Sequence, residues 1–274
     1  MLLSAASLAF ALPCALTAPL SPRQPATAGY PLPLGAVGPL SDLQDPSVCQ
    51  GRDGLLYLFA SGEGIPIRTS SDGGGASSAT PLEGDWEDLG LVISSNTTSG
   101  NNALSPHLVD DPSYPWYLTF GDKSDNLQMI ALNRTTAKPD SLDLIELAKR
   151  PNRDFLGGST VFRTSDPFHW YLLSTFDDPS PSSTTLSTIR ITRTDRSLTD
   201  PYRAKDGGLL QDGNATILLA SHEGVHKPAS PSVWYEEKEG KWKMGYQYVD
   251  DSGRYQIGFN YLDFGTEDGW PELA

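Results

Sequence analysis

Cysteine and basic residues are both scarce in this sequence. Only Cys14 and Cys49 occur among 274 residues, so a disulfide framework is excluded, and we interpret Cys49 as a small hydrophobic residue. Lys and Arg total 20 against 34 Asp and Glu, which gives a net charge of −14. This charge disfavours nucleic acid, anionic membranes and polyuronates as partners, so a neutral polysaccharide is the large partner least in conflict with it.

Long apolar runs are also missing after the N-terminus. Residues 1–18 form a short apolar run that ends in small residues, typical of a signal peptide cut near Ala18; a buried N-terminal helix is the alternative. The run is too short to span a bilayer, and no later stretch is long or apolar enough to do so. We therefore predict a secreted, extracellular protein with a signal peptide at 1–18, a Pro/Ala/Gly-rich leader at 19–40 and one domain at 41–274.

Three Asn-x-Ser/Thr triplets agree with secretion, although such triplets also arise by chance. They predict N-glycosylation at Asn96, Asn133 and Asn214.

Short β-rich runs separated by Gly, Pro, Asp and Asn dominate the sequence from residue 42 onward. Helical periodicity is nearly absent; only residues 142–150 could form a turn or two of helix. The strongest expected strands are aromatic, at 55–60, 116–120, 170–176 and 242–248. Each is followed by a third run, at 65–70, 127–132, 186–192 and 255–262. The chain is therefore expected to be all-β.

The expected strands belong to a repeat. Its opening motifs are DPSV (45–48), SPHL (105–108), GSTV (158–161) and SPSV (230–233), each followed by a turn and an aromatic strand. Spacings of roughly 50 to 70 residues suit four-stranded propeller blades better than a β-sandwich, which would lack this recurring start. We predict a five-bladed β-propeller, with the fifth blade between Thr194 and Ser221. The residues that open the repeats (Asp45, Ser105, Gly157 or Gly158, and Ser230) should then face a central pocket.

At these motifs the sequence resembles glycoside hydrolase family 43, and within it the endo-1,5-α-L-arabinanases, from about residue 42 to 273. Beyond DPSV, the similar segments occur in the order that the family has. They are YLFASG (57–62), TSSD (69–72), YLTFG (117–121), LSTFD (173–177), DPY (200–202), DG (212–213), ILL (217–219) and DGWP (268–271). The resemblance implies a five-bladed propeller that hydrolyses arabinan of the plant cell wall with inversion at the anomeric carbon.

Inverting hydrolysis needs a carboxylate base that activates water and a carboxylic acid that protonates the leaving oxygen. A third carboxylate keeps the pKa of the acid raised by repulsion between like charges. Carried over from the family, the general base falls on Asp45, whereas the two partner positions fall on Ser105 and Gly157. Two of the three expected carboxylates are therefore replaced. Asp45 also has a structural interpretation, since Asp before Pro is common in turns.

Other side chains could restore the missing chemistry. Asp154 is a candidate substitute acid, and Asp110, Asp111 and Asp177 are further carboxylates that could point inward; all four could equally be loop residues. His107 and His226 lie near blade starts, where a proton donor or a substrate contact could sit. Phe120, Trp116 and Phe176 are candidates for stacking on sugar faces, with the blade core as their alternative place.

Three functions are compatible with these residues. The first is a secreted glycosidase, monomeric and without a cofactor, that acts on arabinan or a related pectic side chain. The second is a non-catalytic descendant that binds glycan or a protein partner at the same mouth; changed chemistry on a related sugar is a third. We predict no metal ligands, because Ser230 stands where many arabinanases have a histidine that helps to hold a central ion, so a calcium ion has no support from the sequence.

Overall fold

The computed structural model describes most of the chain from residue 29 onward. The described residues are 29–35, 40–50, 54–61, 67–70, 77–78, 90–94, 103–121, 126–149, 156–165, 168–178, 186–265 and 267–274. Their regular structure is β, apart from the short 3₁₀ helix η1 (Leu210–Asp212), which confirms the all-β prediction. Within these ranges, no helix has the length and apolar character that crossing a membrane requires.

Within the described ranges, sixteen strands form four antiparallel sheets, each a meander in which strands neighbouring in sequence pair with one another. Blade 1 contains β1 (Gln44–Gln50), β2 (Leu56–Ser61), β3 (Ile67–Ser70) and β4 (Ser77–Ser78). Blade 2 contains β5 (His107–Val109), β6 (Trp116–Phe120), β7 (Asn126–Leu132) and β8 (Ile145–Lys149). Blade 3 contains β9 (Leu156–Arg163), β10 (Trp170–Asp178), β11 (Leu186–Thr194) and β12 (Thr216–Leu219). Blade 4 contains β13 (His226–Glu236), β14 (Lys241–Val249), β15 (Tyr255–Asp263) and β16 (Glu272–Leu273).

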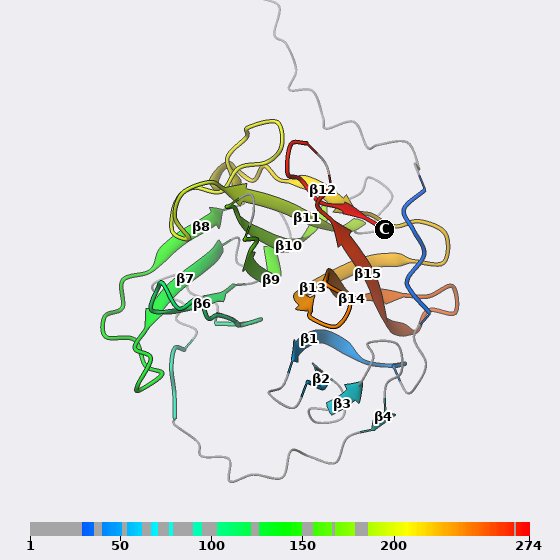
Figure 1. Cartoon of the computed structure of the whole chain (residues 1–274), viewed down its shortest axis with the longest axis horizontal. Helices are drawn as coiled ribbons and strands as arrows, with labels where there is room; N and C mark the ends of the chain where they lie inside the picture. The colour runs from blue at the N-terminus through cyan, green and yellow to red at the C-terminus, as the bar shows by residue number, and fades with distance from the viewer. Residues whose placement is uncertain are drawn as a thin grey trace, which may run out of the picture.

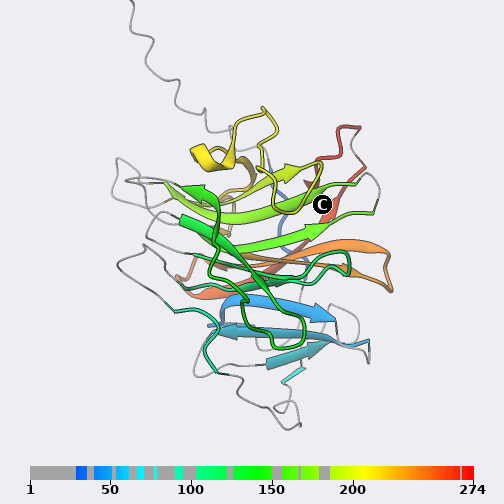
Figure 2. The same ribbon diagram turned by 90° about the vertical axis from the view of Figure 1, so that its left-hand side faces the viewer.

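The four blades surround a common centre, as a β-propeller requires (Figure 1). The first strand of each blade faces this centre, because β1 packs on β13, β13 on β9 and β9 on β5. Blades 1 and 3 lie on opposite sides of the molecule in both views (Figures 1 and 2).

Two details of the sequence prediction are wrong. The segment between Thr194 and Ser221 does not form a fifth blade, because Thr216–Leu219 is β12 and pairs with β11 as the outer strand of blade 3. The described residues therefore account for four blades. Residues 145–149, inside the expected helical turn at 142–150, form β8, since the free edge of β7 gives their backbone a hydrogen-bonding partner.

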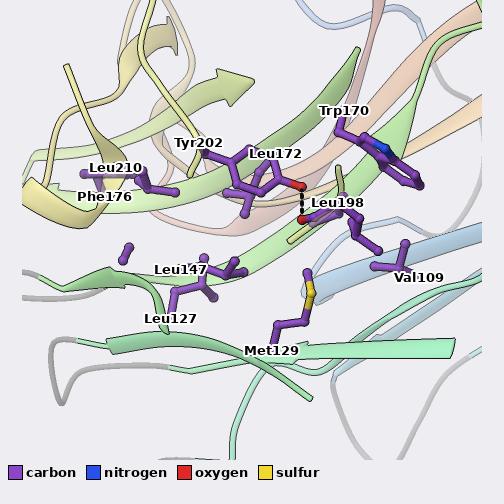
Figure 3. Packing of buried hydrophobic residues seen from close by; sticks show 12 residues of the cluster. Val109, Leu127, Met129, Leu147, Trp170, Leu172, Phe176, Leu198, Tyr202 and Leu210 are labelled. Atoms are coloured by element: carbon purple, nitrogen blue, oxygen red, sulfur yellow. Dashed lines mark hydrogen bonds between the residues drawn. The ribbon is translucent and has the colours of Figure 1, made fainter. Parts of the chain in front are cut away.

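Apolar side chains between neighbouring blades form the core. Between blades 2 and 3, Leu127 and Met129 pack with Leu172 and Phe176, and Tyr202 closes the cluster from the loop after β11 (Figure 3). A second cluster joins blade 3 to blade 4. Each fully buried side chain of this size stabilises the fold by about 1.5–3 kcal/mol, so these clusters hold the blades, and with them the central strands, in fixed positions.

Candidate functional site

The same unusual backbone conformation recurs at the start of every blade. Asp45, Ser105, Gly158 and Ser230 have φ values of 48°, 49°, 54° and 52°. Residues other than glycine rarely adopt this left-handed conformation, and such strain concentrates at functional sites. The pairing register also shifts where Asp45, Gly158 and Ser230 lie, so a bulge turns these residues out of the regular strand.

These four residues line one central pocket of about 510 Å³. Pro46, Pro106 and Pro231, which follow three of them, line it as well. The prediction that the repeat openings converge on one pocket is thus confirmed, with residues from all four blades.

Asp45 is held in place by blade 4. Its Oδ1 accepts a hydrogen bond of 2.8 Å from Ser230 Oγ, and its backbone N–H donates one of 2.6 Å to Gln247 Oε1. Ser230 is itself fixed to blade 3, since its backbone N–H donates to Thr175 Oγ1 at 2.8 Å. Asp45 is exposed and lines the pocket. Its carboxylate therefore contacts solvent in an orientation that the bond from Ser230 fixes.

Blade 3 presents glycine at this point, and the equivalent residue is Gly158. The left-handed φ recurs at Gly158, which lines the pocket. Gly157, onto which the family resemblance places the replaced carboxylate, is the preceding residue of β9 and pairs with Thr175 of β10. A Cβ at Gly158 would lie 2.9 Å from Ser230 Cα and 3.0 Å from its Oγ, so the contact with Ser230 leaves no room for a side chain. In blade 2, Ser105 does line the pocket.

Asp45 is the one carboxylate among the described residues that line the pocket. Asp110 forms an ion pair of 2.8 Å with Arg134, and Asp111 one of 2.9 Å with Arg163. Asp177 accepts a hydrogen bond of 2.5 Å from Ser187 Oγ. These three carboxylates are thus bound elsewhere in the fold, while Asp154 lies outside the described residues.

His107 lines the pocket and also links two blades. Its Nε2 lies 3.2 Å from the Val161 carbonyl oxygen and 3.4 Å from Thr160 Oγ1, both on β9 of blade 3. Burial lowers the pKa of His107, and the bond to the Val161 carbonyl opposes this shift only in part. The ring is therefore neutral near pH 7, with Nε2–H donated to the backbone. His226 lies apart from the pocket lining and pairs with Asp251 at 2.7 Å.

The aromatic residues proposed for sugar stacking lie outside the pocket lining. Phe120 and Phe176 are 1% and 0% exposed, in the cores of blade 2 and of the interface between blades 2 and 3. Trp116 packs against the Phe120 cluster, with the Arg134 guanidinium 5.7 Å from its ring centre. The three rings pack in hydrophobic clusters of the blades and therefore stabilise the fold. This place in the blade core is the alternative that the sequence left open.

A metal ion held by protein side chains does not fit the described part of the pocket. The described residues contain no group of three or more His, Cys, Asp or Glu side chains that could hold one. Where many arabinanases have a histidine that helps to hold a central ion, this chain has Ser230, whose neutral hydroxyl donates its hydrogen to Asp45.

Comparisons with known proteins point to one group of enzymes, although no family model matches the sequence. The chain is 30% identical over 187 residues to the extracellular endo-α-(1→5)-L-arabinanase 1 of Bacillus subtilis, which covers 67% of this chain and 56% of that protein. The chain thus spans little more than half of this relative.

Solved structures share the fold. The glycoside hydrolase family 43 endo-arabinanase of Bacillus licheniformis matches with a TM-score of 0.72 at 23% identity, over 87% of this chain and 100% of that one. The α-L-arabinanase of Cellvibrio cellulosa complexed with arabinohexaose matches with a TM-score of 0.64 at 20% identity, over 85% and 77%.

Proposed function

Because the chain belongs to the arabinanase-like proteins of glycoside hydrolase family 43, we propose that it binds and hydrolyses α-1,5-linked arabinan in its central pocket. The convergence of four blade starts with the same left-handed backbone conformation on one pocket that contains Asp45 carries this proposal. The arabinohexaose bound by the Cellvibrio cellulosa protein supports an arabinan-type polysaccharide as the ligand.

In this mechanism Asp45 acts as the general base. Its carboxylate, oriented by Ser230, removes a proton from a water molecule in the pocket. The water oxygen attacks the anomeric carbon from the face opposite the leaving group, which inverts the configuration. The leaving oxygen takes a proton from a carboxylic acid, for which Asp154 is our candidate.

Glycosides have poor leaving groups, and a general acid contributes typically about 10² to 10⁴ in rate. Ser105 and Gly157 stand where family members are expected to have carboxylates, which favours a second candidate: a propeller that binds glycan, or a protein partner, without turnover.

Activity assays on debranched arabinan and on p-nitrophenyl arabinoside distinguish the two functions. We expect reducing ends to be released from arabinan by the unmodified protein and not by an Asp45→Ala variant. A parallel Asp154→Asn variant tests the acid, and it should lose activity on arabinan more than on the nitrophenyl substrate, whose leaving group needs less protonation. Binding of arabinan without turnover would overturn the hydrolase and support the non-catalytic propeller.

Further predictions accompany this function. The family resemblance implies five blades, while the described residues supply four, so the fifth stays a prediction that an experimental structure tests. Secretion as a monomer with glycans at Asn133 and Asn214, both at least partly accessible, and at Asn96, outside the described residues, also stays a prediction. Mass spectrometry and gel filtration of the secreted protein test these points.

A further inference from the structure

A second pocket, of about 540 Å³, lies between the loop after β11 and the C-terminal segment. Arg193, Arg196, Arg203 and Lys205 line it, together with Asp200 and Trp270. Its place in the fold separates it from the central pocket. Gly158 is near the beginning of β9, whereas Arg193 and Thr194 end β11, which runs parallel to β9, at the opposite end of the blade.

Four cations in one pocket are notable in a chain with only 20 Lys and Arg residues. Two of them are already used. Lys205 Nζ pairs with Asp268 Oδ2 at 2.7 Å, and Arg193 lies 4.8 Å from the centre of the Trp270 ring and 3.4 Å from Asp195. Their bonds tie the C-terminal segment to blade 3.

The other two cations are available to a ligand. Arg196 is exposed and makes no hydrogen bond or ion pair within the described residues. Arg203 is exposed too, and its guanidinium donates one bond, of 3.0 Å, to the Gly207 carbonyl. A guanidinium carries five donors in a planar fork that matches a carboxylate, so both side chains retain donors for one.

The backbone under these arginines is fixed. Arg193 and Arg203 exchange two backbone hydrogen bonds, of 2.9 Å and 2.8 Å, and Leu210 N–H donates to the Tyr202 carbonyl next to Arg203. Tyr202 is 1% exposed within the core between blades 2 and 3. A rigid frame reduces the entropy lost when a ligand binds.

The pocket also contains acceptors. Asp195 and Asp200 lie beside the arginines, and Pro201, Ala204 and Trp270 supply apolar surface. A bare phosphate would make no favourable contact with these two carboxylates. A sugar acid would, since it has hydroxyl groups that donate to carboxylates as well as a carboxylate that accepts from arginine.

We propose that this pocket binds the carboxylate of a uronic acid residue in an acidic glycan. Arg196 and Arg203 hold the carboxylate, and Asp195 and Asp200 accept bonds from ring hydroxyls. The net charge of −14 disfavours polyuronates over most of the surface, so this pocket gives them one local place to bind. The site does not require Asp45 and stands independently of the proposed hydrolysis.

Calorimetric titration of the full protein with a galacturonate trimer tests this proposal. We expect binding that weakens with added salt, and a dissociation constant about tenfold higher or more in an Arg196→Gln/Arg203→Gln double variant. Lys227→Gln is the matched control, because it removes an exposed positive charge on blade 4, outside the pocket, and should leave binding unchanged. Thermal unfolding of each variant verifies that the fold is intact.

Two further ligands sharpen the result. Inorganic phosphate should compete weakly with the trimer, and a neutral arabinose trimer should bind with the same affinity to the double variant as to the unmodified protein. No binding of the galacturonate trimer, equal binding by the double variant, or full displacement by phosphate would each overturn the proposal. The double variant should retain its rate on arabinan, so failure here and failure of the hydrolase function are distinguishable.

Discussion

Ser230 Oγ donates a hydrogen bond of 2.8 Å to Asp45 Oδ1, and this bond joins blade 4 to blade 1 at the centre of the molecule. Both residues have left-handed backbone conformations, with φ of 52° and 48°, and both line the central pocket. The pair sets the direction in which the single described carboxylate of the pocket meets solvent.

Replacing Asp45 by Asn removes the base and keeps the shape of the side chain. We expect the turnover number on debranched arabinan to fall about 10²- to 10⁴-fold, because an amide cannot take a proton from water. Ser47→Ala, a change in the lining of the same pocket, is the control and should retain most of the activity. Assays of reducing ends measure both, and an Asp45→Asn variant with unchanged turnover would exclude Asp45 as the base.

Replacing Ser230 by Gly removes the hydroxyl and leaves the left-handed backbone unstrained, since glycine adopts positive φ readily. A hydrogen bond to a charged group contributes about 1.5–3 kcal/mol, so a loss of turnover of about tenfold or more is expected. As a positioning residue, Ser230 should affect the turnover number more than KM. A rise in KM alone would show that Ser230 contacts the substrate and does not orient Asp45.

Gly158 lies against Ser230, and we expect Gly158→Ala to destabilise the protein. The new Cβ would meet Ser230 Cα at 2.9 Å, and alanine at φ of 54° costs about 1–2 kcal/mol before any clash. Thermal or urea unfolding measures the effect, with Gly240→Ala on blade 4 as the control. Gly240 also has a positive φ, of 64°, but its nearest contact would be 3.6 Å away. Equal losses of stability in the two variants would show that backbone strain, and not the contact with Ser230, causes the destabilisation.

The strands were predictable because short β-rich runs, bounded by turn residues, mark them in the sequence. The four aromatic runs and the four third runs coincide with β2, β6, β10 and β14 and with β3, β7, β11 and β15 to within two residues at every end. The number of blades was not predictable in the same way. Thr216–Leu219 has the composition of a strand, but whether it opens a blade or completes one depends on the free edge of β11, which is a tertiary property.

The site was predictable in position and less so in detail. The repeat placed Asp45, Ser105 and Ser230 in the pocket correctly, because equivalent positions of a repeat occupy equivalent places around the axis. The sequence left both Gly157 and Gly158 open as the residue that opens blade 3, since two adjacent glycines leave no side-chain pattern; Gly158 shares the left-handed conformation of the other three openings and lines the pocket. Nor could the sequence tell core aromatics from exposed ones: Phe120 and Phe176 fit both interpretations until their packing is known.

Phe176→Ala tests the core assignment directly. The side chain is fully buried between blades 2 and 3, so truncation should destabilise the protein by about 3–5 kcal/mol. Urea unfolding measures this loss. At a temperature where the variant is folded, KM for arabinan should stay near its normal value. A large rise in KM with little loss of stability would instead restore Phe176 as a sugar contact.

His107 should make the stability of the protein depend on pH. Burial lowers the pKa of the folded-state ring below its ordinary value of 6.5, so the unfolded chain binds a proton that the folded protein does not. The stabilising contribution is therefore full above pH 6.5 and is lost as the pH falls below it, by up to about 1.4 kcal/mol per pH unit. His169, whose pKa burial also lowers, acts in the same direction.

A His107→Gln variant isolates the contribution of His107. Glutamine can still donate a hydrogen bond to the Val161 carbonyl but takes up no proton, so the free energy of unfolding should fall less steeply than in the unmodified protein between about pH 7 and pH 5. Adding His169→Gln should flatten the curve further. If His107→Gln left the slope unchanged, the pKa of His107 in the folded protein would be no lower than in the unfolded chain, and His107 would make no contribution to the pH dependence of stability.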